Sequence, residues 1–306
     1  MSKRIKQLQS IGEYILFIGL ISIFRMMPRQ LSVKLLVCLF DVIGYRVGVR
    51  KQVAAAQLSK VYPEKSDQEI GQIIRNMYRN MALSIQEIYL DNDRILLSRC
   101  ILDGREHIEA ALAMGRGAIL ATGHFGNWEA ARIMPLWGIP ISVIAKQQRN
   151  RFFDRYTNRI RERNGACIID MKSGLRGIIE HLQKNEMVAI LTDQNAGRHG
   201  LITDFLGFPA SHWKGAAKIA LRYNVPIVPG FVIRDERDQL IFRFEPMIMP
   251  DKPTNLAYSA QSSSEDECLH LIRRINYILE GYITQFPHLW FWVHKRWKHG
   301  FNMFAK

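Results

Sequence analysis

Residues 117–129, GAILATGHFGNWE, decide how this 306-residue chain is interpreted. The run from Gly117 to Thr122 is short and apolar and predicts a buried strand, whereas the run from Glu129 to Met134 predicts a helix. Between the two, His124 falls at the carboxyl end of a strand, where open α/β sheets bind their ligands. This segment therefore predicts an α/β fold with a functional histidine at one edge of the sheet.

His124 and Glu129 are the first candidate catalytic residues. An imidazole that a carboxylate holds in one tautomer can act as a general base toward a hydroxyl group. On a regular helix two residues five apart diverge by about 140°, so the chain must bend between them. Gly123 and Gly126 allow such a bend, and Asn127 is a candidate N-cap for the helix that follows. A structural histidine beside an incidental surface glutamate is the competing interpretation, which spacing alone leaves open.

Strand and helix signals alternate along the rest of the chain. We predict a loop from 193 to about 211, helices at 67–90, 105–114, 151–163, 173–184, 213–223 and 265–285, and strands at 141–145, 166–169, 188–192, 227–234 and 240–245. This alternation indicates a mostly parallel central sheet flanked by helices, with antiparallel strands near one edge.

The N-terminal part of the chain predicts contact with a membrane. Its longest apolar stretch, residues 11–24, is shorter than the roughly 20 residues of a transmembrane helix, but extension to 8–27 brings it close. Basic residues flank it on both sides, so a spanning anchor and a helix in the interface both remain open. Residues 31–49 carry Lys34, Asp41 and Arg46 and suit an amphipathic helix on the bilayer.

We therefore predict a membrane anchor with an interfacial helix over residues 1–50 and a catalytic domain over residues 51–306.

The charge balance indicates an anionic partner. Lys and Arg number 42 against 28 Asp and Glu, a formal net charge of +14. Such an excess draws a protein to an anionic membrane surface, a phosphorylated glycolipid, an acidic carrier protein or nucleic acid. Nucleic acid is not expected, because the sequence lacks a helix-turn-helix, an RNP motif or paired Cys/His ligands. No metal or other cofactor is expected either, since the cysteines and histidines lack metal-ligand spacing.

Four further residues are candidate substrate-binding residues. Between 141 and 165 seven cations accompany two carboxylates, and this run follows the strand after His124. Arginine forks suit phosphate groups, so Arg149 and Arg161 are expected to contact an acidic substrate, although a solvated helix face is the alternative. Asp193 and Gln194 follow another strand and are expected to open on the same crevice as His124.

Several motifs resemble those of the bacterial lipid A biosynthesis acyltransferases, the late (secondary) acyltransferases, over nearly the whole chain. The motifs occur in the order of the family: GHFGNWE at 123–129, RERNG at 161–165, DQ at 193–194 with FLGFPAS at 205–211, and QFPHLWFWVHKRWK at 285–298. The chain departs from the family at 211–214, SHWK, where members usually carry a Thr and smaller residues. The aromatic residues near 290–297 are either a membrane-interface belt or core packing.

The resemblance implies a function. It implies transfer of a fatty acyl chain from an acyl carrier protein thioester to a hydroxyl of a Kdo-bearing lipid A precursor, with His124 and Glu129 as the general-base pair. It also implies a spanning anchor in the bacterial inner membrane, with the catalytic domain on the cytoplasmic face. The alternatives are an acyltransferase for another membrane glycolipid or phospholipid, coenzyme A as donor, and a non-catalytic basic lipid-binding protein.

Overall fold

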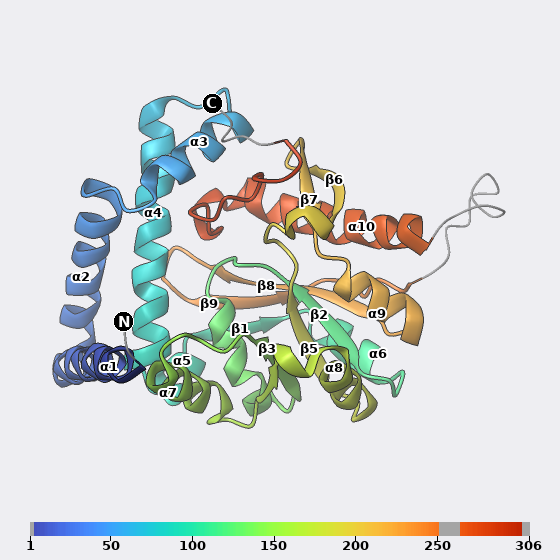
Figure 1. Cartoon of the computed structure of the whole chain (residues 1–306), viewed down its shortest axis with the longest axis horizontal. Helices are drawn as coiled ribbons and strands as arrows, with labels where there is room; N and C mark the ends of the chain where they lie inside the picture. The colour runs from blue at the N-terminus through green and yellow to red at the C-terminus, as the bar shows by residue number, and fades with distance from the viewer. Residues whose placement is uncertain (1–2, 251–263, 302–306) are drawn as a thin grey trace.

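The computed structural model describes residues 3–250 and 264–301 (Figure 1). Its α-helices are α1 (Lys3–Met26), α2 (Arg29–Phe40), α3 (Lys51–Val61), α4 (Asp67–Ile85), α5 (Asp93–Leu97), α6 (Arg105–Leu112), α7 (Arg151–Glu162), α8 (Gly174–Gln183), α9 (Gly215–Tyr223) and α10 (Ser264–Gln285). Its π-helical turns are η1 (Asp41–Arg46) and η2 (Gln86–Leu90), and its 3₁₀ segments are η3 (Trp128–Trp137), η4 (Met171–Ser173), η5 (Gly197–His199) and η6 (Pro287–Leu289). Its strands are β1 (Cys100–Asp103), β2 (Ala118–Thr122), β3 (Ile141–Ala145), β4 (Cys167–Asp170), β5 (Met187–Leu191), β6 (Leu201–Phe205), β7 (Phe208–His212), β8 (Ile227–Arg234) and β9 (Leu240–Phe244).

Seven of these strands form the central sheet in the order β1-β9-β8-β2-β5-β3-β4. β8 and β9 pair antiparallel, and every other neighbouring pair is parallel. The predicted mostly parallel sheet with antiparallel pairing toward one edge is therefore confirmed. β2, which comes directly before His124, occupies the middle of the sheet.

The sheet is covered by helices on both faces, as the continuous apolar run of β2 requires. Successive residues of a strand point to opposite faces. Leu120 accordingly joins the core beneath α6 and η3, whereas Ile119 and Ala121 join the core beneath α8, α9 and α10. All three side chains are nearly or fully buried.

The structure differs from the sequence prediction in two places near the site. The predicted loop to about 211 contains a hairpin, in which β6 pairs antiparallel with β7. Its two-residue turn, Leu206-Gly207, has positive φ angles of 49° and 81°. Asn-Gly is the usual sequence for such a turn, and leucine at the first position gives no sequence signal for a hairpin. The predicted helix after Glu129 is a 3₁₀ helix with Pro135 inside it.

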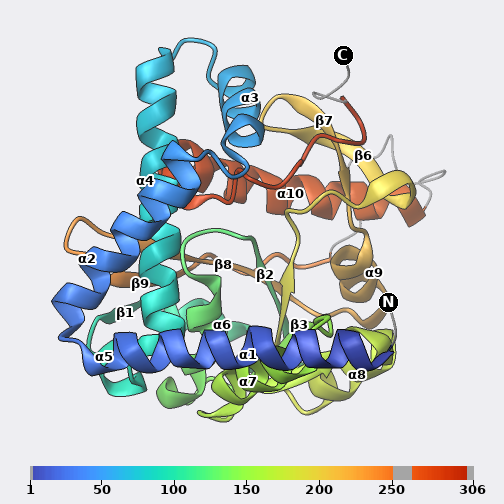
Figure 2. The ribbon, with the colours of Figure 1, turned by 60° about the vertical axis from the view of Figure 1, so that its left-hand side comes forward.

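The N-terminal helices α1 and α2 pack against the rest of the described chain. α1 lies beside α7 and η2, and α2 lies along α4 (Figure 2). Among the described residues one helix, α1, is long and apolar enough to cross a membrane, over Gln7–Met26 with a mean hydropathy of 1.4. Length and composition alone do not distinguish a span from a signal sequence or from a helix docked on a protein surface.

Candidate active site

Strand register brings His124 and Asp193 together. β2 and β5 are parallel neighbours in which Thr122 lies opposite Leu191. His124 and Asp193 each follow two residues later, so both stand at the carboxyl edge of the sheet. The two residues, which the sequence predicts at the ends of two strands, are in direct contact.

The Asp193 carboxylate orients the imidazole of His124. Its Oδ1 lies 2.8 Å from Nδ1 of His124, and its Oδ2 accepts from the His124 backbone N–H at 2.8 Å. The indole Nε1 of Trp290 donates to the same Oδ2 at 2.8 Å. A carboxylate only accepts, so Nδ1 carries the proton and Nε2 keeps its lone pair.

The charges of the pair shift both pKa values. Burial opposes the charged imidazolium, but the charge and hydrogen bond of Asp193, together with the charge of Glu129, raise the pKa of His124 above its ordinary value. Burial would raise the pKa of Asp193, but the charge of His124 and the hydrogen bonds from His124 and Trp290 lower it. The carboxylate therefore stays ionised and stabilises a proton on the imidazole.

Glu129 has a different partner from the one the spacing predicted. Its carboxylate accepts from Nε of Arg161 at 2.8 Å and from Nη2 of the same guanidinium. The predicted role of Glu129 in orienting the imidazole is filled by Asp193. The negative charge of Glu129 contributes, after that of Asp193, to raising the pKa of His124.

Gly123 and Gly126 are each required for a different structural reason. Gly126 has φ +60°, and a Cβ there would stand 1.6 Å from the carbonyl oxygen of Val232. At Gly123 a Cβ would meet the Asp193 carboxylate at 3.2 Å, so this glycine lets Asp193 approach the backbone of His124. The bend predicted from these residues is present.

A buried polar network holds the segment from behind. Glu87 of η2 is fully buried and is bound by Arg234 through two hydrogen bonds of 2.7 and 2.8 Å. Asn127 donates to the same carboxylate at 2.8 Å and makes no side-chain cap, which corrects its predicted role. Asn80 accepts from Arg234 and donates to the carbonyl of Gly126. Sequence reasoning missed this network, because its members lie far apart in the chain.

The other predicted site residues occupy three different environments. The Gln194 side-chain nitrogen lies 3.1 Å from Nε2 of His124. Because Nε2 keeps its lone pair, the amide of Gln194 donates a hydrogen bond to it. Arg161 uses Nε and Nη2 for Glu129 and Nη1 for Asn158. Arg149 is exposed between β3 and α7, next to Gln148.

Two cavities share lining residues close to His124 in the chain. The inner cavity, about 90 Å³, lies against the sheet and is walled mainly by apolar side chains such as Leu120, Met134, Val143, Ala189, Phe242 and Phe244. The outer cavity, about 220 Å³, mixes apolar and polar side chains, among them Phe40, Met81, Ser84, Ile88, Gln148 and Thr157. Trp128, Glu129 and Arg161 line both. The ring centroid of Trp128 lies 4.9 Å from that of His124, so the imidazole packs against a residue that lines both cavities.

The C-terminal aromatic residues form core. Trp290, Trp292 and Trp297 are at most 2 % exposed and pack against one another, so the core alternative holds and the membrane belt does not. Arg296 is fully buried among them and donates to the carbonyl of Ser211. His212 belongs to segment 211–214, where the sequence differs from the family pattern, and its ring accepts a hydrogen bond from Arg296. Burial and the guanidinium charge lower the pKa of His212 to about 2, so the imidazole is neutral.

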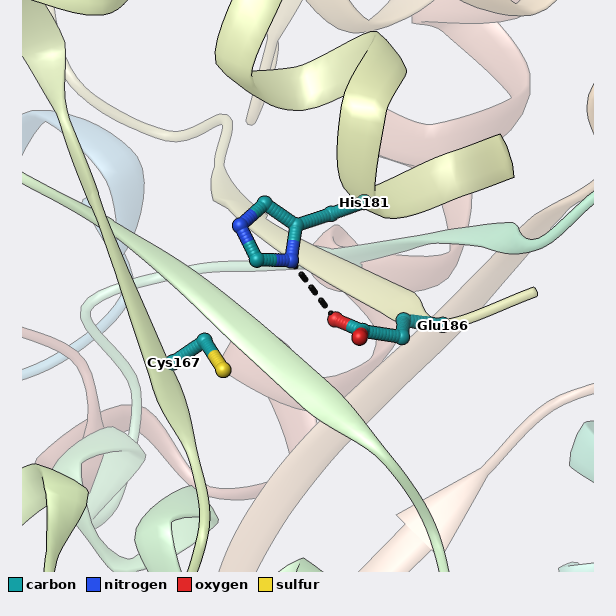
Figure 3. Close-up of side chains that lie close together, drawn as sticks. All are labelled: Cys167, His181 and Glu186. Atoms are coloured by element: carbon teal, nitrogen blue, oxygen red, sulfur yellow. Dashed lines mark hydrogen bonds and ion pairs between the residues drawn. The ribbon is translucent and has the colours of Figure 1, made fainter. Parts of the chain in front are cut away.

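One group of side chains in the described part of the chain has metal-ligand chemistry. Cys167, His181 and Glu186 bring one ligand atom each within 4.8 Å of the others (Figure 3). Nδ1 of His181 contacts Glu186 at 2.7 Å and Ser142 at 2.9 Å. Ser142 and Cys167 lie at the starts of β3 and β4, Glu186 comes directly before β5, and His181 lies near the end of α8, so the group stands at the edge of the sheet opposite His124. The contacts hold the end of α8 against the sheet.

Known proteins with similar sequences point to the same chemistry as the geometry. The sequence profile of a family described as "Bacterial lipid A biosynthesis acyltransferase" matches residues 1–299. The chain is 25 % identical over 256 residues to a lipid A biosynthesis acyltransferase of Haemophilus influenzae, which covers 82 % of this chain and 76 % of the relative. It is 25 % identical over 259 residues to the lipid A biosynthesis lauroyltransferase of Escherichia coli, covering 81 % and 79 %.

A relative whose name gives a different acyl acceptor matches a shorter part of this chain. The phosphatidylinositol mannoside acyltransferase of Mycobacterium tuberculosis is 27 % identical over 165 residues, 52 % of this chain and 50 % of the relative.

Proposed function

The chain belongs to the bacterial lipid A biosynthesis acyltransferase family, and from this premise we propose that it transfers a fatty acyl chain from an acyl carrier protein thioester to a hydroxyl of a Kdo-bearing lipid A precursor. The observation that carries this proposal is the contact between His124 and Asp193, whose imidazole packs against Trp128, a residue that lines two cavities.

In the proposed mechanism His124 is the general base. Asp193 fixes the proton on Nδ1, so Nε2 takes the proton of the acceptor hydroxyl as its oxygen attacks the thioester carbonyl. The C–S bond then breaks, and the imidazolium returns the proton to the departing thiolate. Asp193 lowers the energy of the imidazolium throughout. The amide of Gln194 marks the position at Nε2 that the hydroxyl occupies during the reaction.

The cavities suit the two substrates differently. The narrow inner cavity has apolar walls, so we assign it to the acyl chain, whose burial is favourable by about 0.8 kcal/mol per methylene. The larger outer cavity offers hydroxyl, amide and guanidinium groups, which suit the sugar and acidic groups of a glycolipid. Trp128 lies between the two, next to the imidazole.

Glu129 and Arg161 stand where both substrates meet. We propose that Glu129 supports the charged imidazole from a distance and that Arg161 holds Glu129 in place while its face lines the outer cavity. Arg149 is exposed and follows Gln148 of the cavity wall in the chain, and we assign it to an acidic group of the acceptor. Arg149→Ala is then expected to raise the KM for the acceptor and leave that for the donor unchanged.

The experiment that tests the function is a transfer assay with the purified full chain. Acyl carrier protein carrying fatty chains of several lengths is offered with the Kdo-bearing precursor, and the product is identified by mass spectrometry. The expected product carries one added acyl chain. Coenzyme A thioesters in place of the carrier, and a phosphatidylinositol mannoside in place of the precursor, identify the donor and acceptor. Transfer to the mannoside alone, or to neither acceptor, overturns the proposal.

A further inference from the structure

Helix α1 presents an uncovered apolar stripe. On it Ile5, Leu8, Ile15, Leu16, Leu20, Ile23 and Met26 are exposed. With about 100° between successive residues, these seven side chains fall within an arc of about 140°. The described positions between them on that face are uncharged, namely Gln9, Gly12 and Gly19. Such a stripe is unfavourable in water and requires a cover.

The opposite side of α1 is docked on the protein. The Phe17 ring packs against those of Tyr89 and Phe153, with centroid distances of 5.4 and 4.8 Å. Asn150 donates to the carbonyl of Ser10 at 2.8 Å, and Arg25 donates to the carbonyl of Tyr89 at 2.7 Å. Ser10 and Arg25, the residues of α1 in these two hydrogen bonds, are 15 residues apart, so α1 is held over about 22 Å of its axis.

This docking conflicts with a transmembrane course. α7 lies beside α1 (Figure 2) and carries Arg151, Arg155 and Arg159, all exposed. If the docked α1 crossed a bilayer, these guanidinium groups would enter the hydrocarbon, where charged groups are strongly disfavoured. If α1 lies in the plane of the interface, the arginines can remain beside the acidic headgroups.

Helix α2 extends the apolar surface. It follows Pro28 and packs along α4, with Ser32 and Leu36 buried, while Leu31, Leu35 and Leu39 are exposed at intervals of four residues. Lys34 and Arg46 are exposed in the same region. α1 and α2 lie together at the left side of the molecule in Figure 1, outside α7 and α4. Leucines combined with cations are typical of surfaces that bind anionic bilayers.

We propose that α1 and α2 form a monotopic platform, which lies flat on an anionic phospholipid leaflet with α1 in the interface and not across the bilayer. This inference goes beyond the proposed function, because it concerns the surface and not the reaction. It also places the outer cavity under the platform: the cavity walls include Phe40 of α2, Ile88 and Tyr89 of η2, and Thr157 of α7. A lipid acceptor can then reach His124 from the leaflet without leaving it.

The course of α1 is tested by labelling the full chain in bacterial membranes with a membrane-impermeant maleimide. In a Cys38→Ser background, Gln7→Cys marks the start of α1 and Glu180→Cys, on exposed α8, marks the catalytic domain. The platform predicts that both label in inverted vesicles and neither labels in intact spheroplasts. Labelling of Gln7→Cys from outside spheroplasts overturns it, because the helix must then cross.

The stripe is tested by flotation with vesicles of phosphatidylglycerol and phosphatidylethanolamine. The double variant Leu16→Glu/Leu20→Glu is expected to bind about 100-fold less tightly, because two apolar side chains leave the interface. Gln7→Glu, exposed on the same helix, is the control and is expected to weaken binding at most about 5-fold, since it adds one charge outside the stripe. Equal vesicle binding by the double variant and the control overturns the platform. A stable dimer in which a second copy of the chain covers the stripe also overturns it.

Transfer to acceptor in detergent micelles separates this inference from the proposed function. The double variant keeps micellar activity if only the platform is lost, whereas a chain without activity in micelles contradicts the proposed function and leaves the vesicle result intact.

Discussion

Two histidine–carboxylate pairs stand at opposite edges of the same sheet. His124 and Asp193 meet at the carboxyl edge with Nδ1 and Oδ1 2.8 Å apart, and His181 and Glu186 meet at the amino edge with a 2.7 Å contact. The two imidazoles are almost equally exposed, at 17 % and 16 %, but Asp193 is 2 % exposed and Glu186 17 %. The difference between the pairs therefore lies in the carboxylate.

The surroundings explain why only one pair suits catalysis. Asp193 receives hydrogen bonds from Trp290 and from the backbone of His124 as well as from the ring, so the imidazole cannot turn away. Nε2 of His124 lies 3.1 Å from the Gln194 amide, and the ring packs against Trp128, which lines both cavities. Around His181, Ser142 and Glu186 share the same ring nitrogen, which fixes a helix end instead of presenting a base. A histidine and a carboxylate in contact are therefore insufficient evidence for a catalytic base.

The largest expected effect separates the two histidines. His124→Ala is expected to lower kcat/KM about 10²–10⁴-fold, because the general base is removed. His181→Ala, the matched control, is expected to keep the rate within about 2-fold, since the ring lines neither cavity. The rates come from the transfer assay with carrier-bound acyl donor. Equal losses in both variants would contradict the distinction between the two edges.

Asp193→Asn is expected to lower the rate about 10²-fold and to change its pH dependence. The neutral ring is the active form, so the rate rises with pH through the pKa of His124, which lies above its ordinary value in the parent. The amide of the variant lacks the charge that raises this pKa, so the inflection of kcat/KM moves to lower pH. An inflection that stays in place would show that Asp193 does not set the charge state of His124.

Glu129→Gln is expected to cost roughly 10-fold in kcat/KM, less than Asp193→Asn, because Glu129 acts through charge and through its bonds to Arg161. Glu180→Gln, an exposed glutamate paired with Lys184, is the control. If the loss in Glu129→Gln matches or exceeds that in Asp193→Asn, the pair predicted from the sequence spacing is the functional one after all.

Ala189→Leu tests the depth of the inner cavity between the two edges. Ala189 lies on β5, midway between Glu186 and Asp193, and lines this cavity. Three added carbon atoms fill space assigned to the acyl chain, and each displaced methylene corresponds to about 0.8 kcal/mol. We expect the ratio of kcat/KM for long over short acyl donors to fall roughly 10-fold, measured with a series of carrier-bound chains. An unchanged ratio would place the acyl chain elsewhere.

The smallest expected effect is on stability alone. Glu186→Gln is expected to lower the free energy of unfolding by about 0.5–1.5 kcal/mol near pH 7 without changing the transfer rate, since a hydrogen-bonded pair of modest burial is lost. Burial raises the pKa of Glu186, but the hydrogen bonds from Ser142 and His181 lower it below the ordinary value. The stabilising contribution of the Glu186 carboxylate is therefore fully present at pH values above its ordinary, unfolded-state pKa. It is lost as the pH falls through the pKa of Glu186 in the folded state. Denaturant unfolding at pH 7 and at acidic pH measures it; a difference that grows on acidification would contradict the assignment.

Much of the fold was predictable because it depends on local patterns. The strand predicted at 141–145 is β3, and the helix predicted at 67–90 is α4 continued by η2. The hairpin at 201–212 was missed because its turn has leucine at a positive φ, and η3 was predicted only as a helix of unspecified type. At the site, the sequence identified His124, Asp193 and Gln194 at one sheet edge but assigned the orienting carboxylate to Glu129.

Local sequence patterns suffice to predict the strand–turn–helix segment around His124, the parallel character of the sheet and the apolar N-terminal run, because periodicity and turn residues act over a few positions. Which charged groups meet depends on how distant segments pack. Asp193 lies 69 residues from His124 and reaches it through the register of β2 and β5, and Glu129 meets Arg161 only because α7 packs against η3. The same holds for α1, whose composition fits a span, while its partners on α7 and η2 hold it along the protein surface. Contacts between distant segments depend on packing and register, which no local pattern records.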